Sequence, residues 1–360
     1  MIGGILQIKI ISVGGAGARI LRERGSTPFN VKYMAVDCAS DDFEEGLIAN
    51  EKLAIGECLN FGDVPKENAN VCVKAMEARE EIAAGFLKQT DLLFLVAGLG
   101  GSTGSGAAPV IIRLARQMGI LTFAILVEPF SFEGPVRRSI AKSALGMARK
   151  YADATLLIRN DQLFRLFNIP CKLEDAFDKA NGMIRKCIGN FFDLLTLPRT
   201  LTVDMKDVEF ILKNAGDALF LYGEGNGYDR AKEAFYNALN FTINDQRLYG
   251  AKKALLNIYA NESLELQEID LIKELIRDAA GPMLEEIVNG VTEDKSVGDG
   301  IRIILIATYE KKEPGLSFFG KTQKSVKPAD EGKIAEDRDN SGPGKPKGSG
   351  KIKIPDWIKG

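Results

Sequence analysis

Residues 92–119 read LLFLVAGLGGSTGSGAAPVIIRLARQMG and combine three patterns that indicate the fold class. The apolar run Leu92–Ala97 predicts a buried strand, and Ala107–Gly119 has the pattern of a helix with Pro109 near its start. The glycine run 98–106 joins the two. Strand, glycine loop and helix is the order that holds a phosphate, because glycines let backbone N–H groups approach oxygens closely and a helix N-terminus adds partial positive charge.

The glycine run differs from a Walker A loop, because no lysine follows Gly106. We therefore expect phosphates to be neutralised by backbone amides, by the hydroxyls of Ser102, Thr103 and Ser105, and by a metal ion. The alternative is a flexible glycine-rich surface turn. Five glycines and three hydroxyls between a buried strand and a helix favour phosphate binding over that alternative.

Apolar runs and helical patterns alternate along the first half of the chain, which predicts a parallel α/β sheet covered on both faces. A nucleotide site in such a sheet lies at the carboxyl ends of the strands, and the first strand ends in Gly14-Gly15-Ala16-Gly17. Strands are predicted at Ile5–Val13, Val31–Asp37, Leu53–Gly56, Leu92–Ala97, Leu121–Val127 and Ala154–Ile158, and further helices at Glu67–Leu87 and Arg137–Tyr151.

The second half of the chain predicts a long helix, a smaller α/β region and a tail. An apolar stripe runs along Glu174–Leu195 and predicts the long helix. After it, helices are predicted at Val208–Leu212, Asp229–Leu239 and Leu266–Asn289, alternating with strands at Ala218–Tyr222, Lys253–Ile258 and Gly300–Tyr309. Beyond Lys311 the composition turns rich in Lys, Gly, Pro, Asp and Ser, which predicts disorder. The expected parts are a Rossmann-like nucleotide-binding domain (1–172), a central helix (173–197), a C-terminal α/β domain (198–311), a disordered linker (312–351) and a terminal peptide (352–360).

Composition excludes several classes of function. The chain has no histidine, which excludes catalytic triads that need imidazole and most zinc sites. Its five cysteines are scattered and never in Cys-x-x-Cys spacing, which favours reduced thiols in a cytosolic protein over a disulfide framework. A net charge of −2 gives no basic field that would attract nucleic acid. The chain also has no run of about 20 apolar residues, the length that a membrane-spanning helix needs. We expect a soluble protein with no nucleic-acid partner and no direct membrane insertion.

Together these motifs resemble the tubulin/FtsZ family, whose FtsZ members polymerise with GTP into the cell-division ring. Gly100–Gly106 is similar to the family signature GGGTGTG, residues 127–138 (VEPFSFEGPVRR) to its PFxFEGxxR segment, and residues 158–166 (IRNDQLFRL) to its IPNDKLL segment. The similarity covers essentially the whole chain. It implies a GTPase domain in a cytoplasmic, cytoskeletal protein that assembles head to tail into protofilaments at the mid-cell division site.

The resemblance also implies which residues contact GTP or GDP. Glu133 and Arg137 fall on ribose and phosphate contacts, although they could be a solvated surface pair. Asn160 and Asn181 fall on the positions that read guanine, and Phe177 lies one turn before Asn181, either against the base or as a core aromatic. Mg²⁺ is expected with the nucleotide, and no protein ligand is assigned to it. The implied contacts are Gly14, Gly15, Ala16, Arg19, Gly98, Gly100, Gly101, Ser102, Thr103, Gly104, Ser105, Gly106, Pro129, Glu133, Arg137, Asn160, Phe177 and Asn181.

Residues 201–207 (LTVDMKD) resemble the family's NxDxxD loop, which enters the nucleotide site of the next subunit in a filament. By this resemblance Asp204 and Asp207 are catalytic: they polarise a water for attack on the γ-phosphate or hold a cation. Taken without the family, two aspartates three residues apart are more often charged groups at a helix N-terminus.

The chain departs from the family pattern at four places. The first phosphate loop has Ala16 for a glycine, which narrows the backbone space, and Arg19 for an asparagine; Arg19 either contacts phosphate or is a solvated helix residue. The usual carboxylate after the second strand has moved two positions, to Asp37. The γ-phosphate loop is replaced by residues 61–71 (FGDVPKENANV), and Thr202 replaces a leading asparagine. These changes leave open a nucleotide-binding structural or regulatory paralogue with weak or no GTPase activity.

Two further interpretations concern the ends of the chain. Residues 354–359 (IPDWIK) resemble the family's tail peptide, which implies binding of a membrane-tethering adaptor through Ile354–Ile358; the alternative is a frayed terminus. Gly15-Ala16-Gly17 after the first strand raises a Rossmann dehydrogenase as a second alternative. It lacks GxGxxG spacing and leaves the glycine run 98–106 unexplained.

Overall fold

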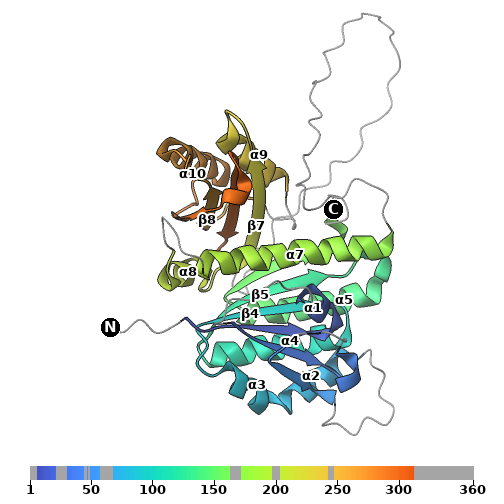
Figure 1. The fold of residues 1–360 in the computed structure, drawn as a ribbon. Helices are drawn as coiled ribbons and strands as arrows, with labels where there is room; N and C mark the ends of the chain where they lie inside the picture. Colours follow the sequence, from blue (N-terminus) through green and yellow to red (C-terminus); the bar gives the residue numbers. More distant parts are fainter. Residues whose placement is uncertain are drawn as a thin grey trace, which may run out of the picture.

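The computed structural model describes residues 6–21, 31–43, 47, 49–56, 68–162, 172–196, 203–241 and 247–311. Within these ranges the chain forms one 10-stranded sheet in the order β3-β2-β1-β4-β5-β6-β7-β10-β8-β9 (Figure 1). The strands are β1 (Ile8–Val13), β2 (Val31–Asp37), β3 (Glu51–Ala54), β4 (Leu92–Gly98), β5 (Leu121–Glu128), β6 (Ala154–Arg159), β7 (Gly216–Gly225), β8 (Lys253–Ala260), β9 (Glu286–Glu293) and β10 (Ile301–Thr308). The α-helices are α1 (Gly14–Leu21), α2 (Ala69–Glu77), α3 (Glu80–Leu87), α4 (Ser102–Gln117), α5 (Pro135–Tyr151), α7 (Leu173–Thr196), α8 (Met205–Leu212), α9 (Arg230–Asn240) and α10 (Leu266–Ala280).

The part of the sheet from β3 to β7 is parallel throughout. Every residue of β1 is buried, and in β4 and β5 every residue but the last. Strands covered by helices on both faces require such uninterrupted apolar sequences. The predicted parallel α/β fold is confirmed.

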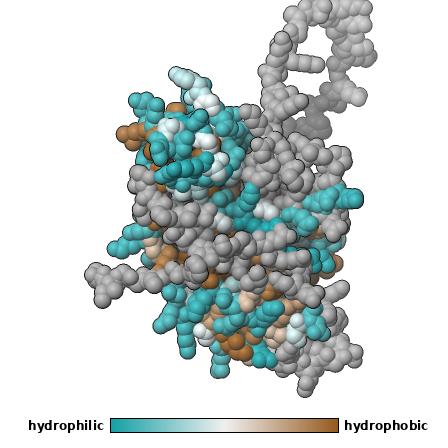
Figure 2. All heavy atoms as spheres, viewed as in Figure 1, coloured by the Kyte–Doolittle hydropathy of each residue, from teal (hydrophilic) through white to brown (hydrophobic). Residues whose placement is uncertain are grey.

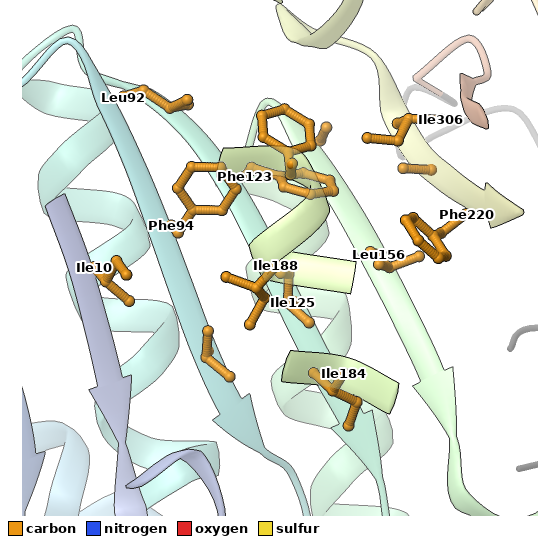
Figure 3. Close-up of a cluster of buried hydrophobic side chains, with 14 of the residues drawn as sticks. Ile10, Leu92, Phe94, Phe123, Ile125, Leu156, Ile184, Ile188, Phe220 and Ile306 are labelled. Atoms are coloured by element: carbon orange, nitrogen blue, oxygen red, sulfur yellow. The ribbon is translucent and has the colours of Figure 1, made fainter. Parts of the chain in front are cut away.

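Different helices cover the two faces of this parallel part. α1, α7 and α8 pack on one face, and α2, α3, α4 and α5 pack on the other. Under α7, the rings of Phe94 and Phe123 meet edge to face with centroids 5.8 Å apart, and the ring of Phe191 of α7 lies 5.0 and 5.4 Å from them. Ile184 and Ile188 of α7 belong to the same apolar cluster (Figure 3). The same apolar cluster continues to Phe220 on β7, so α7 covers the point where the two halves of the sheet meet.

That meeting point is reinforced by buried polar contacts. β6 and β7 pair over a short register, Ala154–Leu156 with Gly216–Ala218. Next to it, Asp153 is 3% exposed and accepts hydrogen bonds from Arg116 Nη1 at 2.7 Å and from the N–H of Thr122 at 3.0 Å. Each oxygen of this buried carboxylate therefore has a donor, as a buried charge requires.

Beyond β7 the sheet departs from the parallel pattern. β10 runs antiparallel to both β7 and β8, and β9 is parallel to β8. The predicted helix Leu266–Asn289 is wrong: α10 ends at Ala280, and β9 occupies the last part of that range. Gly281 has φ +77°, and a Cβ there would lie 2.7 Å from the Tyr249 ring, so the helix ends where only glycine fits.

Two further helix predictions need correction. The predicted helix Glu67–Leu87 is two helices, α2 and α3, with Ala78 and Arg79 between them. The helix predicted at Ala107–Gly119 begins at Ser102, because the second half of the glycine run adopts helical geometry and forms the first turn of α4. Ser102 to Gly106 are therefore helix N-terminal residues rather than loop residues.

The predicted linker 312–351, the terminal peptide 352–360 and most of the altered loop 61–71 lie outside the described residues. None of the helices in the described part of the chain is long and apolar enough to cross a membrane. Hydrophilic side chains dominate the visible surface of the part that contains α9 and α10 (Figure 2).

Candidate functional site

A cavity of about 330 Å³ opens at the carboxyl ends of the parallel strands, where the sequence predicted a nucleotide site. Its wall comes from the first turns of α1 and α4, from the segments after β5 and β6, and from α7. The predicted site residues that line it are Gly14, Gly15, Ala16, Arg19, Gly98, Gly101, Ser102, Thr103, Gly104, Pro129, Glu133, Arg137, Asn160 and Phe177.

Glycines bring the loops after β1 and β4 so close that backbone forms much of the wall. A Cβ on Gly104 would lie 2.0 Å from the carbonyl oxygen of Gly98, and a Cβ on Gly17 would lie 2.6 Å from that of Val96. Gly14 has φ +75°, a conformation that favours glycine. A side chain does not fit at these positions, so the first turns of α1 and α4 pack directly against the backbone of β4.

Ala16 fits this wall because its neighbour has no side chain. A Cβ added to Gly98 would lie only 2.5 Å from the Cβ of Ala16. The sequence predicted that Ala16 narrows the backbone space. The structure shows that Gly98 accommodates the extra methyl group.

Three helices begin at this cavity: α1 at Gly14, α4 at Ser102 and α5 at Pro135. Each N-terminus presents unpaired N–H groups and a partial positive charge. Together with the guanidinium groups of Arg19 and Arg137 on the wall, they favour a ligand that carries several negative charges.

Part of the glycine run supports the cavity from behind. The N–H of Gly100 donates to Ser105 Oγ at 2.8 Å, which closes the loop on itself. Gly100 has φ +95°, and a Cβ on it would lie 3.1 Å from Pro129 Cγ. Gly106 packs on α2, where a Cβ would lie 2.5 Å from the carbonyl oxygen of Ala69. Gly100, Ser105 and Gly106 are absent from the cavity wall.

Glu133 and Arg137 form an ion pair at the rim, with Arg137 Nη1 2.6 Å from Glu133 Oε2. The other oxygen, Oε1, accepts from the N–H of Phe130 at 2.8 Å and so caps the short 3₁₀ turn Ser131–Glu133. The Arg137 side chain is 58% exposed, and its ion pair with Glu133 is made through Nη1. The rest of the guanidinium can therefore donate hydrogen bonds to a ligand oxygen.

The opposite end of the cavity is aromatic and amide-lined. Asn160, 8% exposed, directly follows β6. The Phe177 ring meets Phe130 edge to face at 5.0 Å, and Phe132 stacks on Phe130 at 4.9 Å. Asn181 lies one turn further along α7, partly exposed, and is absent from the cavity wall.

Asp37 stands behind the wall. Thr103 Oγ1 donates to Asp37 Oδ1 at 3.1 Å and also lies 3.1 Å from Cys38 Sγ. The carboxylate is 6% exposed, so it orients Thr103 from the interior.

Sequence reasoning missed three residues of the wall: Leu99, Val127 and Glu128. Glu128 carries a recognisable signal, because it is the charged last residue of a buried parallel strand and so lies at the edge where ligands bind. It pairs with Arg159 at 3.0 Å.

Asp204 and Asp207 lie away from the cavity, at the N-terminus of α8 beside the far end of α7 (Figure 1). Asp204 Oδ1 accepts from the N–H of Asp207, and Asp207 Oδ2 accepts from the N–H of Asp204, both at 2.9 Å. This capping box is the arrangement expected of two aspartates three residues apart at a helix N-terminus when the family resemblance is set aside. Within one chain, neither carboxylate reaches the cavity.

Comparison with known proteins agrees with this geometry. Residues 7–168 match the GTPase domain of the tubulin/FtsZ family, and residues 216–310 match the C-terminal domain of the FtsZ family. The cell division protein FtsZ of Buchnera aphidicola subsp. Acyrthosiphon pisum is 30% identical over 306 residues, which cover 84% of this chain and 78% of that protein. The FtsZ of subsp. Baizongia pistaciae is 29% identical over 303 residues, with the same coverage.

Solved structures show the same fold. An empty FtsZ dimer from M. jannaschii superimposes with a TM-score of 0.76 at 28% identity, over 89% of this chain and 96% of that one. CetZ2 from Haloferax volcanii, a GTPγS-bound protofilament, gives a TM-score of 0.71 at 21% identity, over 84% and 92%. The matching families are not those of dehydrogenases, so the Rossmann dehydrogenase alternative has no support.

Proposed function

The chain belongs to the FtsZ family of tubulin-like cell division GTPases, and on that premise we propose that its 330 Å³ cavity binds GTP and GDP. The observation that carries the proposal is the backbone wall around Gly98 and Gly104, where a Cβ on Gly104 would lie 2.0 Å from the carbonyl oxygen of Gly98 and a Cβ on Gly98 would lie 2.5 Å from the Cβ of Ala16. A site built without side chains suits a phosphate chain, which accepts hydrogen bonds from converging N–H groups.

The remaining wall residues fit the other parts of a guanosine nucleotide. Thr103 offers a hydroxyl oriented by Asp37, and Arg137 offers guanidinium donors to phosphate oxygens. Glu133 suits ribose hydroxyls. Asn160 presents an amide donor and acceptor for the guanine edge, and Phe177 lines the same cavity. Asn181, one turn further along α7 and outside the cavity wall, is assigned to the guanine by the family resemblance alone.

Mg²⁺ fits this site as a companion of the phosphates. No group of three carboxylate, thiol or imidazole side chains that could hold a metal occurs among the described residues. Mg²⁺ commonly takes its ligands from phosphate oxygens and water together with one or two carboxylates, so it needs no such cluster. When bound, it supplies charge neutralisation to the phosphate oxygens.

Hydrolysis is completed between subunits. Because Asp204 and Asp207 sit at α8, far along α7 from the cavity, a second chain stacked head to tail brings its α8 to the first chain's nucleotide. The similarity to an FtsZ dimer from M. jannaschii supports self-association. In that contact the two carboxylates orient and polarise a water for in-line attack on the γ-phosphate, while the cavity amides hold the developing charge.

The same proposal extends to the cellular role. Head-to-tail contacts that do not close into a ring generate open filaments. We place these filaments in the cytoplasm at the mid-cell division site. The tail peptide Ile354–Ile358, outside the described residues, binds a membrane-tethering adaptor while the long linker sets its effective concentration.

GTP turnover and filament assembly test the proposal together. Wild-type protein should scatter light with GTP or a slowly hydrolysed analogue, and its phosphate release per chain should rise with protein concentration. Asp207→Asn should still assemble and bind nucleotide but lose at least about tenfold in turnover.

Asp229→Asn is the control, since Asp229 is an exposed aspartate at the start of another helix, α9. It should hydrolyse GTP at the wild-type rate. Equal turnover in Asp207→Asn and wild type would contradict hydrolysis in trans. Assembly without turnover in the wild type would support the structural paralogue instead.

A further inference from the structure

Two cysteine thiols that are far apart in the sequence meet beside the cavity. Cys38 directly follows β2, Cys72 lies in the first turn of α2, and their Sγ atoms are 3.1 Å apart. The sequence shows these cysteines as scattered residues, and the fold brings them together. A disulfide needs an S–S distance of about 2.05 Å, so the two sulfurs are about 1 Å from bonding distance.

Each thiol is held in place by a close glycine contact. The N–H of Gly56 donates to the carbonyl oxygen of Cys38 at 2.7 Å, and a Cβ on Gly56 would lie 2.4 Å from that oxygen. On the other side, a Cβ on Gly106 would lie 2.6 Å from the Cβ of Cys72. Neither cysteine is on a loose surface segment, so the pair stays close together.

The two thiols are chemically different. Cys72 is 4% exposed, whereas Cys38 is partly exposed and reachable from solvent. A hydrogen bond from the Cys72 thiol, with help from Thr103, lowers the pKa of Cys38 to about 7 against the opposing effect of burial. The same hydrogen bond, followed by burial, raises the pKa of Cys72. One accessible thiolate next to one protonated thiol is the arrangement of a nucleophilic and a resolving cysteine.

We propose that Cys38 and Cys72 are a peroxide-reactive dithiol that closes reversibly to an intramolecular disulfide. The Cys38 thiolate attacks one peroxide oxygen, the O–O bond breaks, and a sulfenic acid forms with release of hydroxide, which takes up a proton as water. Cys72 sulfur then attacks the Cys38 sulfur, the S–O bond breaks, and a second water leaves with the Cys72 proton. Two thiols lose two electrons, and one hydrogen peroxide is reduced to two waters.

The disulfide has a direct route to the nucleotide site. Closing the bond moves Cys38 Sγ, which lies 3.1 Å from Thr103 Oγ1, and Thr103 lines the cavity. It also ties the first turn of α2 to the end of β2. This effect rests on the proposed function: the loss of one orienting contact at Thr103 should weaken GDP binding about fivefold.

Peptide mapping of the full-length protein tests the modification. Reduced protein is treated with one equivalent of hydrogen peroxide, remaining thiols are blocked with a maleimide, and the digest is analysed by mass spectrometry. The expected product is a Cys38–Cys72 cross-linked peptide two hydrogen atoms lighter than the reduced pair and restored by dithiothreitol. Cys58, Cys171 and Cys187 should remain maleimide-labelled, which makes them internal controls.

Two variants separate the steps. Cys72→Ser should leave a Cys38 sulfenic acid that dimedone traps, and Cys38→Ser should remove both products while the protein still melts cooperatively. A cross-link through Cys58, a disulfide between chains, or an unmodified pair would overturn the proposal. The mapping needs no nucleotide, so its outcome is independent of whether the cavity binds one.

Titration with a fluorescent GDP analogue tests the link to the cavity. Oxidised wild type should bind about fivefold more weakly than reduced wild type, and peroxide treatment should not change the affinity of Cys38→Ser. Equal affinities of the oxidised and reduced proteins would overturn the coupling. Absence of binding in the reduced protein would instead contradict the proposed nucleotide site.

Discussion

Ala16 and Gly98 share one side-chain volume on the cavity wall: a Cβ on Gly98 would lie 2.5 Å from the Cβ of Ala16. Ala16 lies in the first turn of α1, directly after β1, and Gly98 is the last residue of β4. Because β1 and β4 are neighbours in the sheet, the two segments meet, and the space between them holds one methyl group and not two. An alanine where the family has glycine is tolerated here because the opposite position is glycine.

This contact predicts a double-mutant result. Gly98→Ala should push the start of α1 and the end of β4 apart and weaken nucleotide binding at least about tenfold. The overpacking should also lower the free energy of unfolding by about 1–3 kcal/mol. Ala16→Gly combined with Gly98→Ala should restore most of both losses, because the clash involves only the Ala16 methyl group at short range. Titration with a fluorescent nucleotide and urea denaturation measure the two effects. Gly146→Ala, in α5 with open space around it, is the control and should not weaken binding. If the double mutant bound nucleotide as weakly as Gly98→Ala alone, the two positions would not compete for the same space.

Arg137 should contribute to binding and little to stability. Its ion pair with Glu133 joins the 3₁₀ turn to α5, and the Arg137 side chain is 58% exposed, so the pair is worth only about 0.2–1 kcal/mol. A charge-assisted bond to phosphate is worth about 1.5–3 kcal/mol, so Arg137→Ala should lower GDP affinity about tenfold or more. Arg138→Ala, the exposed neighbour, should bind like wild type. Equal affinities for the two variants would exclude Arg137 from the phosphate site.

The capping box of α8 gives Asp204 a structural role in addition to the catalytic role that we propose for it. Asp204→Ala removes the acceptor for the N–H of Asp207 and should cost about 1 kcal/mol of unfolding free energy. Asp204→Asn keeps an acceptor at the same place, so its unfolding free energy should be within a few tenths of a kcal/mol of the wild-type value. Urea denaturation distinguishes the two, and GTP turnover of Asp204→Asn then reports on chemistry rather than folding. If Asp204→Asn is as unstable as Asp204→Ala, the carboxylate charge at the helix N-terminus matters more than the cap.

The Arg230–Glu268 pair predicts a pH-dependent stability. Glu268 accepts from Arg230 Nε at 2.6 Å and Nη2 at 2.7 Å. Burial alone would raise the pKa of Glu268, but the hydrogen bonds from Arg230 and from the N–H of Glu265 lower it below the ordinary value of 4.5. A carboxyl with a lowered pKa contributes its stability above pH 4.5 and loses it as the pH falls through the folded-state value.

Glu268→Gln should therefore be less stable than wild type by about 2 kcal/mol at pH 7, and the difference should shrink as the pH falls below about 4. Urea denaturation at several pH values measures it. Glu286→Gln, an exposed glutamate at the start of β9, should match wild type at each pH. A difference that stays constant with pH would mean that packing, and not the ionised carboxylate, is responsible.

The glycine run 98–106 and the apolar strand before it were sufficient to predict one wall of the cavity, where we propose that the phosphates bind. The reason is local: a strand, a glycine turn and a helix are each encoded within a few residues, and their order fixes which edge of the sheet carries the loop. The segments around Glu133, Arg137 and Asn160 were placed equally well, since each follows a buried parallel strand. β9 was missed because Leu266–Asn289 was read as one helical pattern through Gly281, whose positive φ ends the helix.

The sequence by itself determined the parallel sheet, the position of the glycine loops and the family. Only the tertiary structure decided which residues share space: Ala16 with Gly98, Thr103 with Asp37, and Cys38 with Cys72. It also showed that Asp204 and Asp207 cap α8 at a distance from their own cavity. These relationships join segments that the chain separates by up to dozens of residues. Hydrophobic packing of helices on a twisted sheet sets such distances, and no local pattern encodes them.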